Sequence, residues 1–318
     1  MDQASSKLRE LWRFAAAREF VVGRDELLEH GFGRHQIRSW LRTGRLLRVL
    51  QSVYSYGRDV DSSNAVWRAA LLAAGPGSAL TGLSACQKWG FVEMRQTIPA
   101  TIEVAAATGK ARSFMGVSPA TRNTRVNVTR RQYNESDLRA KDGVALLSPV
   151  LALIDLAGSA TDREIRFAFL EACRLGLFRD ADVSISFEMM VGRRGARRLR
   201  PLLGLWRPEL NRIRSVFEGL FLLAWIERGY PMPLVNVKVH GKEVDCFWPG
   251  KGFVLELDGG TYHRYPAQLN IDLGKQAMLE AQGLTVARLT FGRFEADPWR
   301  EVDRVAAMLG FTEAPSKG

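Results

Sequence analysis

Two apolar runs that carry acidic residues constrain the C-terminal third of this chain most strongly. The runs are residues 244–248 (VDCFW) and 254–259 (VLELDG), separated by a Pro-Gly-Lys-Gly turn. Residues two apart share a face of a β-strand, so Glu256 and Asp258 point one way while the flanking leucines point the other. If the two runs pair as a hairpin, Asp245 lies across from this acidic face.

Such a cluster of carboxylates has a direct chemical consequence. Carboxylates that converge at a strand edge repel one another unless a hard cation such as Mg²⁺ neutralises them. That cation can activate a water and stabilise charge developing on a phosphoryl group. His263 follows closely, and an imidazole can transfer protons near neutral pH. The alternative is an ordinary half-exposed hairpin with solvated acids, and the spacing alone favours neither interpretation.

A family resemblance extends over this region. The stretches that carry it are, in order, residues 215–218 (SVFE), 244–248, 255–259 with His263, then Asp272 and Lys275, and 283–290 (GLTVARLT). They resemble the bacterial domain of unknown function 559, related to the very-short-patch-repair endonucleases in the PD-(D/E)-x-K nuclease superfamily. The resemblance implies a restriction-endonuclease-like α/β core. It implies a site for Mg²⁺ or Mn²⁺ that uses Asp245 and Glu256, with Asp258 and His263 close by.

Two positions depart from the family pattern or have a second explanation. The superfamily's lysine, two residues after the second acid, is Asp258 here, and the candidates to replace it are Lys242, Lys251, Lys275 and His263. The resemblance implies that Glu218, on the helix before the hairpin, reaches the metal indirectly. It also forms a helix-capping box with Ser215, three residues earlier.

The first sixty residues predict a winged helix-turn-helix. Apolar spacing predicts helices that begin at Ser6, at Asp25 and after Gly33, followed by a two-stranded hairpin over residues 46–56. This order places the third helix in the major groove of DNA. The residues expected on the DNA-facing side are Arg34, Gln36, Arg38, Arg42, Arg45 and Arg48. Gln36 and Arg38 can reach base edges, and Arg42, Arg45 and Arg48 can contact phosphates. The alternative is that these side chains form a solvated helix face.

The same region resembles the N-terminal domain of AbiEi-family antitoxins. The likeness rests on residues 20–28 (FVVGRDELL), 36–41 (QIRSWL) and 44–49 (GRLLRV), and continues more loosely to about residue 207 through residues 80–85 and 148–157. Those antitoxins bind their own promoter and oppose a nucleotidyltransferase-like toxin. The resemblance therefore implies transcriptional regulation as the competing function.

The middle third mixes helices and strands. Strands are expected at residues 101–105 and 125–129, and helices at 65–74, 84–89, from Pro149 and from Thr161 or Asp162. Residues 193–200 (RRGARRLR) contain five arginines. They either follow a phosphate backbone or form the solvated face of a helix that buries Leu199, Leu202 and Leu203.

Charge and composition complete the division into domains. The net charge of +11 is distributed as +4 over residues 1–60, +8 over 61–208 and −1 over 209–318. The first two parts can attract phosphate, while the last keeps an acidic set suited to metal. Three scattered cysteines, no apolar run of about 20 residues and no signal peptide predict a cytoplasmic protein outside the membrane, without a cysteine-based structural zinc.

The sequence therefore predicts an α/β multidomain chain. Its parts are a winged helix (1–60), a mixed α/β AbiEi-like middle domain (61–208) and a restriction-endonuclease-like domain (209–318). The expected function is Mg²⁺- or Mn²⁺-dependent cleavage of double-stranded DNA, in phage defence or DNA processing. The alternative is a non-catalytic antitoxin or autoregulator with a degenerate nuclease fold, whose partner is a nucleotidyltransferase-like toxin.

Overall fold

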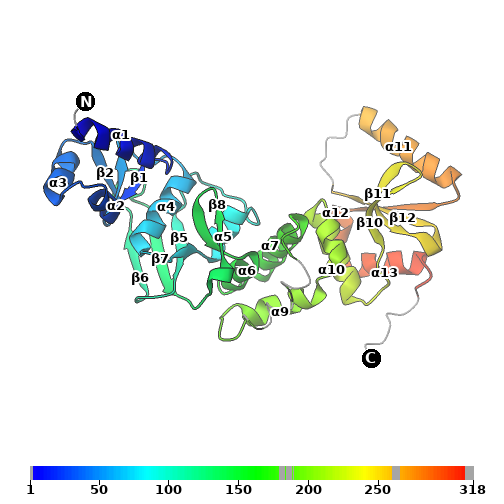
Figure 1. Cartoon of the computed structure of the whole chain (residues 1–318). Helices are drawn as coiled ribbons and strands as arrows, with labels where there is room; N and C mark the ends of the chain where they lie inside the picture. The colour runs from blue at the N-terminus through cyan, green and yellow to red at the C-terminus, as the bar shows by residue number, and fades with distance from the viewer. Residues whose placement is uncertain (1–2, 179–182, 184–187, 189, 260–265, 312–318) are drawn as a thin grey trace. The chain divides into compact units, whose positions relative to one another are not determined.

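The chain contains two compact units, each with its own helices and sheets. The computed structural model describes residues 3–178, 183, 188, 190–259 and 266–311. Unit 1 comprises residues 1–165 and 186–199, and unit 2 comprises 166–185 and 200–318 (Figure 1). Mixed helices and strands in both units confirm the α/β multidomain class. The division into three domains stays a prediction.

Unit 1 begins with the expected order of a helix, two further helices and a hairpin. The elements are α1 (Gln3–Ala16), β1 (Val21–Gly23), α2 (Arg24–Glu29), α3 (Arg34–Arg42), β2 (Leu46–Leu50) and β3 (Val53–Tyr56). The strands form an antiparallel sheet in the order β1-β3-β2. Strand β1, which the sequence did not predict, joins the hairpin through β3. Strand β2 is left at the edge of this sheet.

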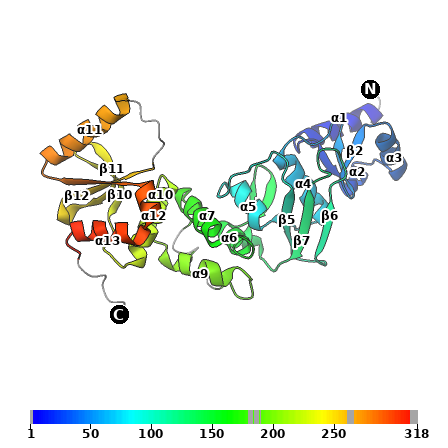
Figure 2. The same ribbon diagram turned by 180° about the vertical axis from the view of Figure 1, so that it is seen from behind.

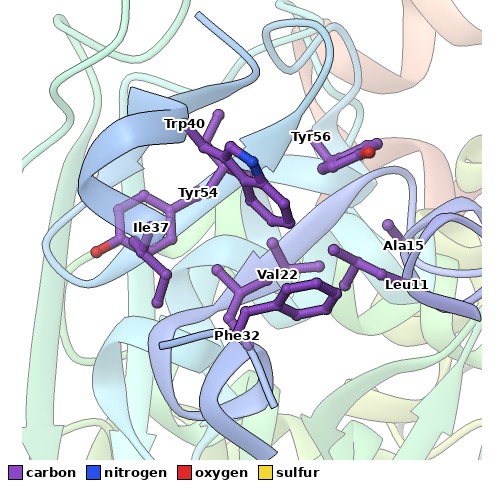
Figure 3. Packing of buried hydrophobic residues seen from close by; sticks show 10 residues of the cluster. Leu11, Ala15, Val22, Phe32, Ile37, Trp40, Tyr54 and Tyr56 are labelled. Atoms are coloured by element: carbon purple, nitrogen blue, oxygen red, sulfur yellow. The ribbon is translucent and has the colours of Figure 1, made fainter. Parts of the chain in front are cut away.

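A shared apolar core holds these elements together. Leu11, Val22 and Phe32 are buried with Trp40 and Tyr56 (Figure 3). The rings of Phe32 and Trp40 lie 4.9 Å apart. Because Trp40 comes from α3 and Tyr56 from β3, the core fixes α3 against the hairpin, and its opposite face remains exposed.

The rest of unit 1 is built on a six-stranded sheet. Its helices are α4 (Ser63–Ala74), α5 (Gly82–Trp89), α6 (Pro149–Leu156) and the start of α7 (Asp162–Arg174). Its strands are β4 (Ala79–Leu80), β5 (Thr101–Ala106), β6 (Arg112–Met115), β7 (Arg125–Arg130), β8 (Leu138–Lys141) and β9 (Val144–Leu147). The strand order is β6-β7-β5-β4-β9-β8. The strands expected near residues 101 and 125 and all four expected helices are present.

Unit 2 contains a four-stranded sheet between helices. Its elements are α10 (Val216–Glu227), β10 (Leu234–Val239), β11 (Lys242–Trp248), β12 (Phe253–Asp258), α11 (Pro266–Ala281), β13 (Thr285–Thr290), α12 (Phe291–Ala296) and α13 (Pro298–Met308). Strands β10, β11 and β12 are antiparallel neighbours, and β13 is parallel to β12. Helix α11 lies on one side of the sheet and α10 and α13 on the other (Figures 1 and 2). No helix in the described parts of the chain is long and apolar enough to cross a membrane.

Candidate functional site

The two acids of the expected metal site lie on neighbouring strands of unit 2. The ladder between β11 and β12 pairs Trp248 with Phe253 and continues to Cys246 with Leu255. At the next position the Asp245 carboxylate accepts a hydrogen bond of 2.6 Å from the backbone N–H of Leu257. Leu257 follows Glu256 directly, so the structure brings Asp245 and Glu256 together, as the hairpin pattern implied.

The surroundings of Asp245 disfavour the ionised form of its carboxyl group. Burial is the largest effect, and together with the charges of Glu256 and Glu218 it raises the pKa of Asp245 from 3.8 to about 6. The hydrogen bond from Leu257 and the charge of Lys275 act in the other direction. Asp245 thus lies in a poorly solvated space near two other carboxylates, where a cation is favoured.

Lys275, on α11, supplies one positive charge at this place. Its Nζ lies 2.8 Å from Oε1 of Glu256, and both side chains are largely buried. Of the other candidates for the missing lysine, Lys242 is exposed at the start of β11, and Lys251 lies over the Phe311 ring. His263 lies outside the described residues. Within the described part of the chain, Lys275 is therefore the candidate that contacts one of the acids, Glu256.

Glu218 is buried at the start of α10 and has a structural role. One of its carboxylate oxygens accepts from the Ser215 hydroxyl at 2.9 Å, and the other from the backbone N–H of Arg214 at 2.9 Å and the Asn236 amide at 2.7 Å. The Ser215 hydroxyl in turn accepts from the backbone N–H of Glu218. The capping contact is thus present, with Arg214 in place of the expected backbone donor Ser215. Glu218 acts on Asp245 through its charge.

The fit of a metal ion to these side chains is partial. Among the described residues, no group of three or more His, Cys, Asp and Glu side chains is placed to hold a metal. Asp258 ends β12, where it pairs with Thr290 of β13. The chemistry of Asp245 and Glu256, two crowded carboxylates with Glu256 Oε1 inaccessible to solvent, nevertheless suits a hard cation.

Comparison with known proteins adds a distant likeness. No protein-family model matches the chain. Two proteins described as uncharacterized, from Mycobacterium tuberculosis strains CDC 1551 / Oshkosh and ATCC 25618 / H37Rv, are each 28% identical over 123 residues. The match covers 37% of this chain and 44% of either relative, so the chain spans less than half the length of the curated relatives it matches.

Unit 1 presents the basic surface that the sequence assigned to DNA. All six of these side chains are exposed, namely Arg34, Gln36, Arg38 and Arg42 on α3 and Arg45 and Arg48 at β2. Ile37 and Trp40 on the same helix are buried. Arg45 is also oriented, because its Nε donates to the Tyr56 hydroxyl at 3.1 Å and its guanidinium lies 5.1 Å from the Trp40 ring centre.

The arginine-rich tract includes the helix that was one of its two expected interpretations, and contact of this tract with a phosphate backbone stays a prediction. Leu199, Leu202 and Leu203 of α9 (Ala196–Leu205) are buried, as expected for a helix with a solvated face. Arg193 donates to Asp155 at 3.1 and 3.2 Å, a contact that the sequence analysis missed. Asp155 is one residue in an apolar helix, α6, and this isolated acid was the only available signal. Arg193 therefore serves an internal ion pair.

Proposed function

We propose that this protein is a divalent-cation-dependent endonuclease that binds duplex DNA through unit 1 and hydrolyses a phosphodiester bond in unit 2. The observation that supports this function best is the meeting of Asp245, Glu256 and Lys275 in one largely buried place. Two acids and one amine, shielded from water, form a polar set that unit 2 does not need for its apolar core. A cytoplasmic location belongs to the same proposal, since Cys86, Cys173 and Cys246 are all free and buried.

Each side chain has a role that its position allows. Asp245 and Glu256 hold the cation, Mg²⁺ or Mn²⁺, which when bound activates a water and offsets charge on the phosphate. Lys275 orients Glu256 and places an ammonium group where the phosphate oxygens become more negative. Asp258, at the end of the same strand as Glu256, assists these two acids or holds a water beside the cation, and His263 is proposed to transfer a proton.

DNA binding is assigned to α3 and the hairpin of unit 1. The exposed Gln36 and Arg38 would contact base edges, and Arg42, Arg45 and Arg48 the phosphates. The ordered stacking of Arg45 on Trp40 reduces the entropy that this side chain loses on binding.

Cleavage of supercoiled plasmid tests the catalytic part. The wild-type protein should nick the plasmid with Mn²⁺ or Mg²⁺ and leave it intact with EDTA. Asp245→Ala and Glu256→Ala should abolish cleavage and preserve DNA binding, and Lys275→Met should lower the rate. Lys242→Met, which removes an exposed lysine from the same unit, is the matched control and should cleave normally. A wild-type protein that binds DNA and cleaves with neither cation rules out the nuclease.

The second candidate is a regulator or antitoxin that does not cleave. It is favoured by the existing contacts of the acids, because Glu256 is already paired with Lys275 and both oxygens of Glu218 accept hydrogen bonds. Such a protein would bind a specific promoter without metal and would neutralise a nucleotidyltransferase-like toxin. Footprinting on the upstream region of its own gene, together with co-expression with a neighbouring toxin gene, tests this function directly.

A further inference from the structure

A loop of the middle region is attached to the edge of the winged-helix hairpin. Strand β2 is the edge of its sheet, and its Val49 carbonyl accepts hydrogen bonds from the middle region instead of from another strand. The donors are the backbone N–H of Val117 and the Thr121 hydroxyl, both at 2.9 Å. Residues 116–124, which connect β6 to β7, will be called the 116–124 loop. It covers a strand edge that would otherwise be open.

The conformation of this loop is fixed by several further contacts. Asp59, just after the hairpin, accepts from the backbone N–H of Ala120 at 3.0 Å. The hydroxyls of Ser118 and Thr121 lie 3.1 Å apart and are buried. A Cβ atom at Gly116 would lie 2.1 Å from the Thr121 carbonyl oxygen, so only glycine fits there. The loop is therefore a defined extension of the hairpin.

Two arginines next to the contacts that hold the loop make no polar side-chain contact among the described residues. Arg122 directly follows Thr121, and Arg125 opens β7 directly after Thr124, whose carbonyl accepts from the Gly116 N–H. Both side chains are exposed. Within the described part of the chain, neither guanidinium takes part in a hydrogen bond, an ion pair or a ring contact. They differ in this respect from Arg193 and Arg198, which pair with Asp155 and Asp162.

The hydrogen bond between Thr121 and Val49 keeps Arg122 close enough to Arg48 for both to reach one stretch of DNA backbone. Arg48 precedes Val49 and Arg122 follows Thr121, and Val49 and Thr121 are joined by one hydrogen bond. Adding the bonds along this path puts the two Cα atoms at most about 15 Å apart. Phosphates of one strand follow one another at about 3.4 Å along the helix axis, so this limit corresponds to at most about four base steps.

We propose that the 116–124 loop and the start of β7 belong to the DNA-contact surface, and that Arg122 and Arg125 bind backbone phosphates beside Arg45 and Arg48. The inference rests on the proposed duplex DNA binding of unit 1 and extends it from the winged helix into the middle region. Since phosphate contacts carry no sequence information, these two arginines add affinity and register, and specificity stays with α3.

The test is the salt dependence of binding to a labelled duplex, measured by fluorescence anisotropy with the full chain in EDTA. For R122A/R125A, the slope of log affinity against log salt should be lower than the wild-type slope by about two, one for each lost phosphate contact. The matched control is R130A/R139A, which removes the same charge. Arg130 is exposed at the opposite end of β7, and Arg139 is exposed on β8, at the far edge of the sheet. The control should keep the wild-type slope.

The outcomes separate this inference from the function on which it rests. If R38A/R42A lowers the slope and R122A/R125A does not, DNA binding by α3 stands and the role of the loop is refuted. An equal loss in R130A/R139A would assign the effect to net charge and would also refute it. Absence of wild-type binding would refute duplex binding itself. Unchanged circular dichroism in both double variants is expected, because neither removes an anchor of the loop.

Discussion

Asp245→Asn should make unit 2 more stable, and the gain should depend on pH. The pKa of Asp245 is raised to about 6 by burial and by neighbouring acids, so the folded state disfavours its ionised form. Asparagine has nearly the same shape, and its side-chain oxygen can still accept the hydrogen bond from the Leu257 N–H. The substitution therefore removes a charge and keeps the contact.

The size of the effect follows from the two pKa values. A rise from 3.8 to about 6 is roughly two pKa units, each equivalent to about 1.4 kcal/mol, so ionised Asp245 costs about 3 kcal/mol of folding free energy. Because the folded state holds the proton more tightly, this cost is absent below pH 3.8 and complete above about pH 6. Asp245→Asn should stabilise by about 3 kcal/mol at pH 8 and by about half as much at pH 5.

Urea unfolding in EDTA at the two pH values measures this difference. Trp225 and Trp248, both buried in unit 2, contribute a fluorescence signal from that unit. Glu280→Gln, which removes an exposed carboxylate from α11, is the control and should give no pH-dependent gain. A gain for Asp245→Asn that is equal at both pH values, or a loss at pH 8, would refute the reasoning from crowded and buried acids.

Two further substitutions test the winged helix and the helix cap. Trp40→Ala removes a buried ring that contacts Phe32 and supports Arg45. The substitution should lower the unfolding free energy of unit 1 by about 3–5 kcal/mol, as measured by urea titration. A loss below about 1 kcal/mol would contradict this packing. Ser215→Ala removes the hydroxyl that caps α10 and should cost about 1 kcal/mol, with Ser215→Thr as the conservative control that should retain most of the stability.

The helices and the hairpin of the first sixty residues could be predicted from the sequence because their boundaries depend on local chemistry. Gly33 precedes α3 and Gly44 follows it, and the alternation of apolar residues identifies β2 and β3. Strand β1 was missed because three residues are too few for a periodic pattern, and it becomes a strand only through pairing with β3. Local signals therefore predict long elements better than short ones that need a distant partner.

The candidate site shows the same division. The proximity of Asp245 and Glu256 follows from the hairpin pattern, because the turn between the runs is short and Gly252 adopts the left-handed conformation that closes it, with φ of 56°. The choice of Lys275 among the candidate lysines could not be made, since it depends on how α11 packs on the sheet. The left-handed Asn236, which directs its amide to Glu218 from within β10, gave no sequence signal at all.

The charges around Asp245 bear on the choice between the two proposed functions. Asp245, Glu256 and Glu218 act on one another in a largely buried space, and the single buried cation there is Lys275, as far as the described residues show. One ammonium cannot balance three carboxylates, and this surplus of negative charge adds to burial, the larger effect, in disfavouring the ionised form of Asp245. A scaffold without catalytic function gains nothing from this cost, since one asparagine would relieve it at no loss of shape. A site that binds a divalent cation needs this surplus of negative charge. With a pKa of about 6, Asp245 is ionised at neutral pH, and its repulsion with the neighbouring carboxylates is removed when the cation binds. A measured gain in stability for Asp245→Asn in EDTA, reversed in favour of the wild type by Mn²⁺, would therefore support the enzyme; a gain of the same size with and without Mn²⁺ would support the regulator.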